Sequence, residues 1–355
     1  MFLAWKELKR NKMRYGLIAV MMILLSFLVV MITGLANGLS YDNASFIKTT
    51  KMEHFVLSDD AEKKLLRSSI SESDEKAMTK GFEEKEYAAL HINMSTLTKE
   101  KDGKKVDVTV VAGPNVTNVI PDITEGKNIK GNTEIVVDEK LKKKGIKISD
   151  KLQDPISKQL FTVVGFTKNA SFSHTGIVFM NKESWDKIAL PNQKEFNTVG
   201  FTKKPSVKDS KWEIVSKKEL LQNIPGYKEE QGTLMMIVGF LLTISALLIA
   251  TFFYVITLQK VKQIGVLKAI GTSNRILTMS LVWQSILISA FAFVISGISL
   301  FGVQQIMPES MPFLLGNATI LLFGCVFVVI SIFGTCISLI PILKVHPLEA
   351  IGGNE

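Results

Sequence analysis

The sequence has little cysteine and no recognisable catalytic motif, and each absence excludes a class of protein. Its only two cysteines, Cys325 and Cys336, lie inside one apolar run, so neither a disulfide framework nor a cysteine zinc site is available. The four histidines are scattered and form no H-E-x-x-H motif, so they predict no metal set. Zinc-finger spacing and RNP-like aromatic motifs are also missing. The net charge of +9 therefore points to anionic membrane lipid and membrane topology, and not to nucleic acid.

The chain also lacks a nucleotide-binding loop. No G-x-x-x-x-G-K-[ST] occurs, because Gly265 and Gly271 are wrongly spaced and no lysine follows Gly271. No G-x-S-x-G nucleophile elbow occurs either. The sequence does not exclude a Ser-His-Asp triad, because the three residues of a triad can come from distant parts of a chain. We expect a protein that is not an enzyme, holds no intrinsic cofactor and takes its energy from a partner.

Charge is nearly absent from four long apolar runs, at 16–39, 231–258, 276–303 and 318–343. Each run is long enough to cross a bilayer as a helix, and the first is too long for a signal peptide. Without charges inside the spans an ion relay is disfavoured, so we expect an apolar or amphipathic substrate that enters from the bilayer. Residues Gly34 and Gly38 form a GxxxG that allows close helix contact or a flexible exit from the membrane.

The stretch 40–230 is charged, rich in lysine and broken by turns, which predicts one soluble domain. Alternating apolar residues predict strands, and a helical period predicts helices. The expected strands are 87–97, 106–112, 133–137, 160–166 and 176–180, and the expected helices are 59–66, 73–79 and 182–189. The predicted fold class is an α-helical membrane protein with four transmembrane helices and one large extracytoplasmic α+β domain between the first two.

Orientation follows from the distribution of basic residues. An amphipathic helix at 1–15, the loop 259–275 and the tail 344–355 contain lysine or arginine, whereas the loop 304–317 contains none. Since loops rich in basic residues stay in the cytoplasm, both termini should be cytoplasmic and the large domain outside. The expected location is a cell membrane that the chain crosses several times.

The basic loop reads QKVKQIGVLKAIGTSNRI from 259 to 276. Its apolar residues recur about every three positions, which predicts a short helix whose lysines, Lys260, Lys262 and Lys268, stay solvated. Gly271 suits a left-handed helix end, and Thr272 or Ser273 can cap the next helix. Gly265 in mid-helix would let another subunit approach closely, although an ordinary basic loop is the alternative.

Several segments resemble the FtsX-like and MacB-type ABC-transporter permeases. The loop core at 263–275 is similar to the segment of that family that docks on a separate ATPase, and EIVVDEKLKKKGIKISDKL at 134–152, FTVVGF at 161–166 and GIVFMNKESW at 176–185 resemble its extracytoplasmic domain. Ser149-Asp150 stands where the family often has Gly-Asp, so the resemblance does not predict the geometry of that turn. The ending KVHPLEAI, with Pro347, Glu349 and Ala350, resembles the family's tail. The resemblance implies a homodimer with two ATPase subunits. The implied coupling residues are Val261, Ile264, Gly265, Leu267, Lys268, Ile270 and Gly271.

The single outer domain and the start AWKELKRNK…GLANGLS look like the haem-exporting branch of this family in Gram-positive bacteria, the HrtB type. Haem iron takes methionine, histidine, tyrosine or carboxylate ligands. Residues of these types near the outer ends of the first two spans are Met31, Tyr41, Tyr227, Glu229, Glu230, Met235 and Met236. Each residue also has a structural explanation: the methionines fill apolar space, the tyrosines lie at the membrane interface and the glutamates are solvated. Two other functions stay open for the chain, which are export of a peptide, lipopeptide or lipid, and regulation of a cell-wall hydrolase as FtsX does.

Overall fold

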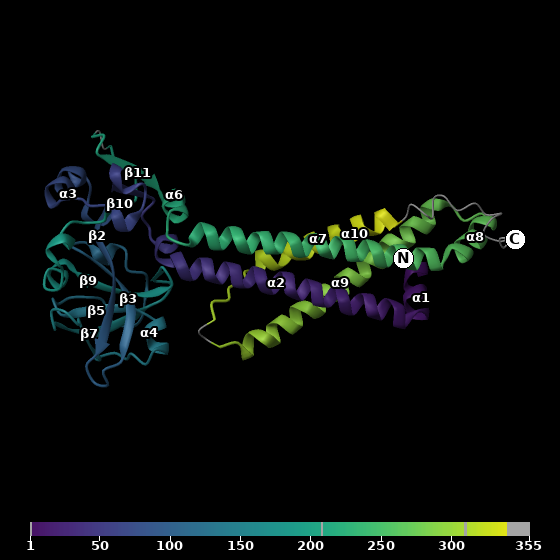
Figure 1. Cartoon of the computed structure of the whole chain (residues 1–355), viewed down its shortest axis with the longest axis horizontal. Helices are drawn as coiled ribbons and strands as arrows, with labels where there is room; N and C mark the ends of the chain where they lie inside the picture. The colour runs from purple at the N-terminus through teal and green to yellow at the C-terminus, as the bar shows by residue number, and fades with distance from the viewer. Residues whose placement is uncertain (1, 207–208, 309–310, 339–355) are drawn as a thin grey trace. The chain divides into compact units, whose positions relative to one another are not determined.

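The computed structural model describes residues 2–206, 209–308 and 311–338. It divides into two compact units, one made of Met1–Asn37 with Gly232–Glu355 and the other of Gly38–Gln231 (Figure 1). The prediction of four helices long and apolar enough to span a membrane, with a sheet domain between the first and second, is confirmed. The fourth span is described only to Ser338, and the predicted tail at 344–355 lies outside the described residues.

The helical unit contains two short helices and most of the four long ones. The bounds are α1 Phe2–Arg10, α2 Lys12–Thr49, α7 Tyr227–Gln259, α8 Val261–Ala269, α9 Asn274–Ile306 and α10 Asn317–Ser338. The break before the first long helix falls at Asn11, earlier than the expected boundary at 15. The last turns of α2 and the first turn of α7 belong to the sheet domain.

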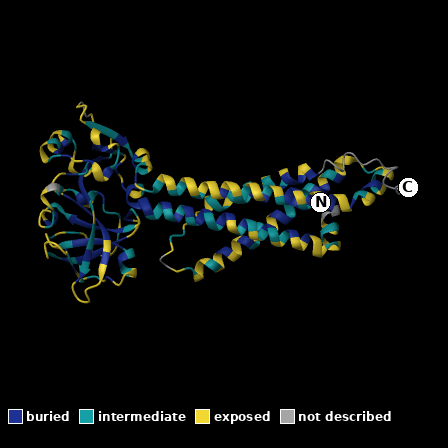
Figure 2. Ribbon diagram, in the orientation of Figure 1, coloured by how far each residue is buried: buried dark blue, intermediate teal, exposed yellow. Residues whose placement is uncertain are grey.

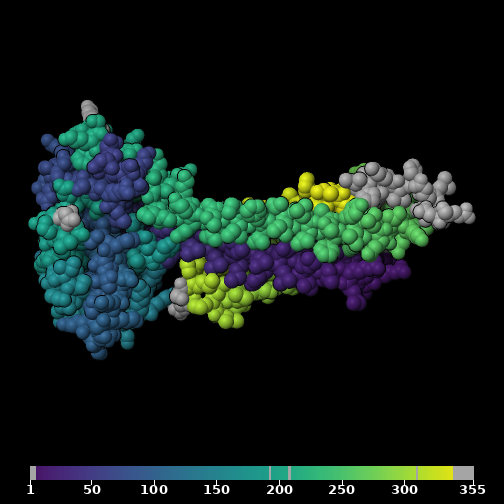
Figure 3. Space-filling model, viewed as in Figure 1, coloured from purple at the N-terminus to yellow at the C-terminus, as the bar shows by residue number. Residues whose placement is uncertain are grey.

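Small and polar residues let the long helices pack closely. One core joins α2, α7, α9 and α10 through side chains such as Met22, Phe253 and Phe327. A Cβ atom on Gly334 would lie 3.1 Å from the backbone nitrogen of Ala250, so α10 and α7 approach almost backbone to backbone. In contrast, much of α7 carries exposed apolar side chains and is uncovered along the face seen in Figure 3. That face suits lipid or another membrane subunit.

The sheet domain is a mixed sheet of eleven strands. The path runs β11-β1-β10-β2-β3-β9-β5-β7-β4, with β6 beside β2 and β7 and with β8 beside β9; the pairs β3–β9 and β5–β7 are parallel. The strands are β1 His54–Ser58, β2 Tyr87–Lys99, β3 Lys105–Gly113, β4 Ile123–Gly126, β5 Glu134–Asp138, β6 Lys151–Gln153, β7 Leu160–Thr167, β8 Ser171–Phe172, β9 Thr175–Asn181, β10 Thr198–Phe201 and β11 Trp212–Ser216, and the helices are α3 Glu72–Thr79, α4 Lys140–Lys143, α5 Lys182–Trp185 and α6 Lys217–Gln222.

Both faces of the sheet are buried, as the dark core in Figure 2 shows. The end of α2 packs on one face, where the Phe46 and Phe179 rings lie 5.9 Å apart, and α6 adds Leu220. On the other face α4 contributes Leu141 and α5 contributes Trp185. The end of α2 is therefore part of the domain core.

The structure confirms all five predicted strands and the helix at 73–79, while the helix expected at 182–189 is only the short α5. The helix predicted at 59–66 is wrong. Two 3-10 turns, Asp59–Ala61 and Leu65–Arg67, stand there because Glu62 and Lys63 adopt positive φ angles of 50° and 61°, which end a right-handed helix.

The turn at Ser149 gives a stability prediction. Ser149 adopts a φ of 70°, a conformation that costs a residue with a side chain roughly 1–2 kcal/mol and glycine almost nothing. Ser149→Gly should therefore stabilise the domain, by about 0.5–1 kcal/mol after the greater freedom of glycine in the unfolded chain is subtracted. Thermal unfolding of the intact protein checks this. Ser157→Gly, in an exposed turn without a positive φ, is the control; a lower midpoint for Ser149→Gly would contradict the expectation.

Candidate substrate and coupling sites

The first candidate site lies in the sheet domain, where the end of α2 meets the start of α7. Asn43 of α2 contacts the segment just before α7, since its Nδ2 donates to the carbonyl of Pro225 at 3.3 Å. The Lys48 ammonium lies 5.8 Å from the centre of the Tyr41 ring and 5.1 Å from that of Tyr227. Two tyrosines that are far apart in the sequence thus flank one cation.

His174 bridges the same two helices. Its Nδ1 lies 3.3 Å from Oδ2 of Asp42 on α2, and its Nε2 lies 3.0 Å from Oε1 of Glu230 on α7. Only the imidazolium form has hydrogens to donate to both carboxylates at once. Lys140 forms an ion pair with Asp42, so two basic side chains meet two acidic ones.

Local backbone geometry places His174 and Lys140. Ser173 and His174 both have positive φ angles, as in the tight turns that join neighbouring antiparallel strands, and they connect β8 to β9. Asp138 accepts hydrogen bonds from the backbone nitrogens of Lys140 at 2.9 Å and Ala170 at 2.8 Å, which fixes the start of α4 beside β8. Burial raises the pKa of the Asp138 carboxyl, against the effect of these two donors.

Two buried acceptors at this site have no hydrogen-bond partner among the described residues. They are Oδ1 of Asn43 and Oε2 of Glu230. Since a buried acceptor without a donor costs about 1–3 kcal/mol, the site is suited to receive a donor or an electrophilic centre. Among the described residues no group of three or more histidine, cysteine or acidic side chains is arranged to hold a bare metal ion.

The structure groups some of the predicted substrate residues and separates others. Tyr41, Tyr227 and Glu230 come together around Lys48 and His174, whereas Glu229 is exposed. The three methionines belong to the helical unit: Met31 is half-buried on α2, and Met235 and Met236 are exposed on α7. Sequence reasoning missed Asp42, Lys140 and His174, because no spacing in the chain links them.

The second candidate site is the loop between the second and third spans, which forms the predicted short helix. α7 ends at Gln259, Lys260 leaves helical geometry with φ −101° and ψ 1°, and α8 follows. The left-handed end at Gly271 is confirmed by its φ of 90° and by hydrogen bonds from Gly271 N to Lys268 O at 3.0 Å and from Thr272 N to Leu267 O at 2.9 Å. Ser273 stands at the start of α9 with extended backbone.

The faces of α8 differ from the predicted ones. Ile264 and Leu267 pack on Leu277 and Leu281 of α9, and Gly265 is buried with them. Gly265 is therefore covered within this chain, and its role as a coupling residue stays a prediction. Val261 is half-buried and Lys268 is half-buried as well, whereas the exposed apolar side chains are Val266, at 51%, and Ile270, at 75%.

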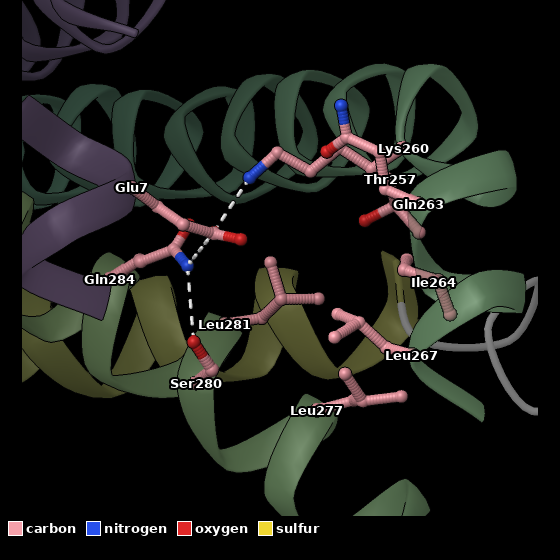
Figure 4. Close-up of a pocket in the computed structure, with 10 residues that line it drawn as sticks. All are labelled: Glu7, Thr257, Lys260, Gln263, Ile264, Leu267, Leu277, Ser280, Leu281 and Gln284. Atoms are coloured by element: carbon pink, nitrogen blue, oxygen red, sulfur yellow. Dashed lines mark hydrogen bonds and ion pairs between the residues drawn. The ribbon is translucent and has the colours of Figure 1, made fainter. Parts of the chain in front are cut away.

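The prediction that Lys260 stays solvated is wrong. Lys260 is 7% exposed, and its ammonium lies 2.7 Å from Oε2 of Glu7 on α1 and 2.8 Å from the hydroxyl of Tyr15 on α2. Gln284 of α9 completes the group, since its Nε2 donates to the Glu7 carboxylate at 2.5 Å (Figure 4). Its Oε1 accepts from the Tyr15 hydroxyl at 2.5 Å. This Glu7–Lys260 pair therefore joins four helical segments.

Comparison with known proteins identifies relatives along the whole chain. Residues 235–347 match the family model described as the C-terminal region of FtsX-like permeases. The chain is 32% identical to the protein named as the hemin transport system permease HrtB of Staphylococcus haemolyticus, and 32% identical to that of Staphylococcus epidermidis, with 100% of each chain covered. Among solved structures, the extracellular domain of the ABC-type transporter YknZ from Gram-positive bacteria matches 46% of this chain and 98% of its own, with 13% identity and a TM-score of 0.34.

Proposed function

We propose that this chain, which belongs to the FtsX-like family of ABC-transporter permeases, is the membrane subunit of an exporter that removes haem from the bilayer. A separate ATPase subunit would bind and hydrolyse ATP. The observation that carries the proposal is the 32% identity over the full length to permeases named for hemin transport. In the proposed assembly two copies of the chain meet in the membrane with two ATPase subunits, both termini are cytoplasmic, and the sheet domain is outside.

The chemistry of the first candidate site supports haem as the substrate. Haem is a flat apolar molecule with two carboxylates, and its iron accepts tyrosine, histidine, methionine or carboxylate ligands. Tyr41, Tyr227, Glu230 and His174 provide three of these ligand types, and Lys48 and Lys140 provide positive charge for the carboxylates. The exposed apolar face of α7, with Met235 and Met236, would accept the macrocycle from the lipid.

Haem titration of the purified protein tests the proposal. We expect saturable binding near one haem per dimer, with a shifted absorption band, and a loss of about tenfold in affinity for Tyr227→Phe or Glu230→Gln, equivalent to about 1.4 kcal/mol. Met31→Leu tests the methionine in the helical unit separately.

Two other residues of α7 serve as matched controls. Glu229→Gln changes the adjacent, exposed glutamate, and Tyr254→Phe changes a tyrosine that is 43% exposed further along α7. Both should bind haem as the original protein does. If the protein binds no haem specifically, the haem proposal fails, and peptide or lipid export or regulation of a cell-wall hydrolase would take its place within the same permease family.

A further inference from the structure

We infer that the ion pair between the buried Lys260 and the half-buried Glu7 is the link that transmits movement of α8 to the membrane helices, so that Glu7 and Lys260 are positioning residues for energy coupling. The inference rests on the proposed function, because it assumes that an ATPase subunit moves α8. It adds to that function a specific contact outside the surface that would touch the ATPase.

The position of Lys260 is the first reason. It is the residue at which the chain leaves α7 and turns into α8, so any rotation of α8 moves its backbone. Its side chain does not follow α8 into solvent but ends between Glu7 of α1 and Tyr15 of α2. Through Gln284 the same group reaches α9. A displacement of α8 would thus reach three other segments at one point.

The energetics of the pair are the second reason. Lys260 is taken out of water while the Glu7 side chain stays 28% exposed, so the lysine bears most of the desolvation cost, which offsets much of the attraction between the two charges. Apolar residues of similar size often replace such pairs without loss of stability. The surroundings here would suit apolar residues, since Ile264, Leu267 and Leu281 line the same pocket. Stability alone therefore does not account for a charged pair at this bend.

The space beside the pair is the third reason. A cavity of about 40 Å³ lies between Lys260 and the leucine side chains, large enough for a water molecule. Thr257, one turn before Lys260, is fully buried there, and its hydroxyl has no hydrogen-bond partner among the described residues. Unlike a close-packed interior, this pocket leaves room for the lysine to shift as α8 moves.

The test uses the complex purified with its ATPase and reconstituted into liposomes loaded with hemin. ATP hydrolysis and haem delivered to an external apo-haem protein are measured together. The double variant Glu7→Met/Lys260→Met should keep the thermal midpoint and the ATPase of the complex, but the haem moved per ATP should fall at least about tenfold. Lys262→Met, an exposed lysine on α8, is the matched control and should couple normally. Normal coupling in the double variant would overturn the inference, as would an equal loss in Lys262→Met.

A second measurement needs neither ATPase nor haem. Spin labels are placed at Trp5→Cys on α1 and Val266→Cys on α8, both exposed, after Cys325 and Cys336 are changed to serine. A single narrow distance that broadens in the double variant supports the link, and an unchanged distance overturns it. If the unaltered complex retains no ATPase or moves no haem, the proposed function fails, and this arm still decides whether the Glu7–Lys260 pair holds α8 to α1.

Discussion

Aspartate at both Val266 and Ile270 should abolish copurification of the permease with its ATPase subunit. These are the exposed apolar side chains of α8 and of the turn after it, at 51% and 75% exposure. A partner that docks on α8 must bury them, and placing two carboxylates there would leave unpaired charges in the interface. Since single central contacts often contribute 2 kcal/mol or more, we expect affinity to fall by more than about 100-fold.

The permease itself should stay intact in this variant, because neither side chain contributes to the packing of α8 on α9. Expression in the membrane and the thermal midpoint check this point. The matched control is Ile306→Asp, which changes an isoleucine that is 84% exposed at the other end of α9. If the double variant retains the ATPase while the control also does, the docking surface lies elsewhere on the chain.

The sequence predicts the strands whose own pattern specifies them. β3, β5, β7 and β9 contain runs of β-branched residues, and β2 alternates apolar and polar residues from Leu90 to Ser95, so these five strands can be predicted from the local sequence. The missed strands are β1, β4, β6, β8, β10 and β11. Of these, β1, β10 and β11 depend on distant partners: Phe55 of β1 pairs with Gly200 of β10 on one side and with Val215 of β11 on the other. Pairing between strands so far apart in the sequence cannot be predicted from a short stretch of neighbouring residues.

The candidate sites show the same division between local and distant information. The turn at Gly271 is predictable because a glycine directly after a helical pattern favours the left-handed conformation that ends a helix. The burial of Lys260 is not predictable from the local sequence, because its partner Glu7 lies 253 positions earlier. A lysine in a basic loop is normally expected to be solvated. His174 is likewise placed by the β8–β9 turn against two helices from opposite ends of the domain.

The sheet domain should lose stability on mild acidification because of one buried histidine. His91 is 1% exposed, with its ring 4.4 Å from that of Phe196 and 5.5 Å from that of Trp185. Its Nδ1 lies 2.9 Å from the carbonyl of Glu195, while its Nε2 has no hydrogen-bond partner among the described residues. Burial lowers the pKa of His91 from 6.5 to about 4, because the charged ring would be desolvated.

The direction of the effect follows from proton uptake. Between pH 6.5 and about 4 the unfolded chain binds a proton at His91 and the folded domain does not, so protonation favours unfolding. Above pH 6.5 protonation of His91 costs the folded domain no stability. As the pH falls from 6.5 toward 4, the free energy of unfolding decreases by about 3 kcal/mol, at 1.36 kcal/mol per pH unit. Below that pH the folded domain takes up the proton too, and the loss stops.

Unfolding of the intact protein across this pH range, followed by tryptophan fluorescence, measures the effect. Because buried carboxyls such as Glu75 have raised pKa values and act in the opposite direction, the informative quantity is the difference between the original protein and His91→Leu. That difference should shrink or reverse as the pH falls from 6.5 to 4, because the variant has no proton to bind there. His54→Gln, on β1 of the same sheet, should retain the acid sensitivity. A difference that stays constant across the range would show that His91 accepts a proton in the folded domain as readily as in the unfolded chain.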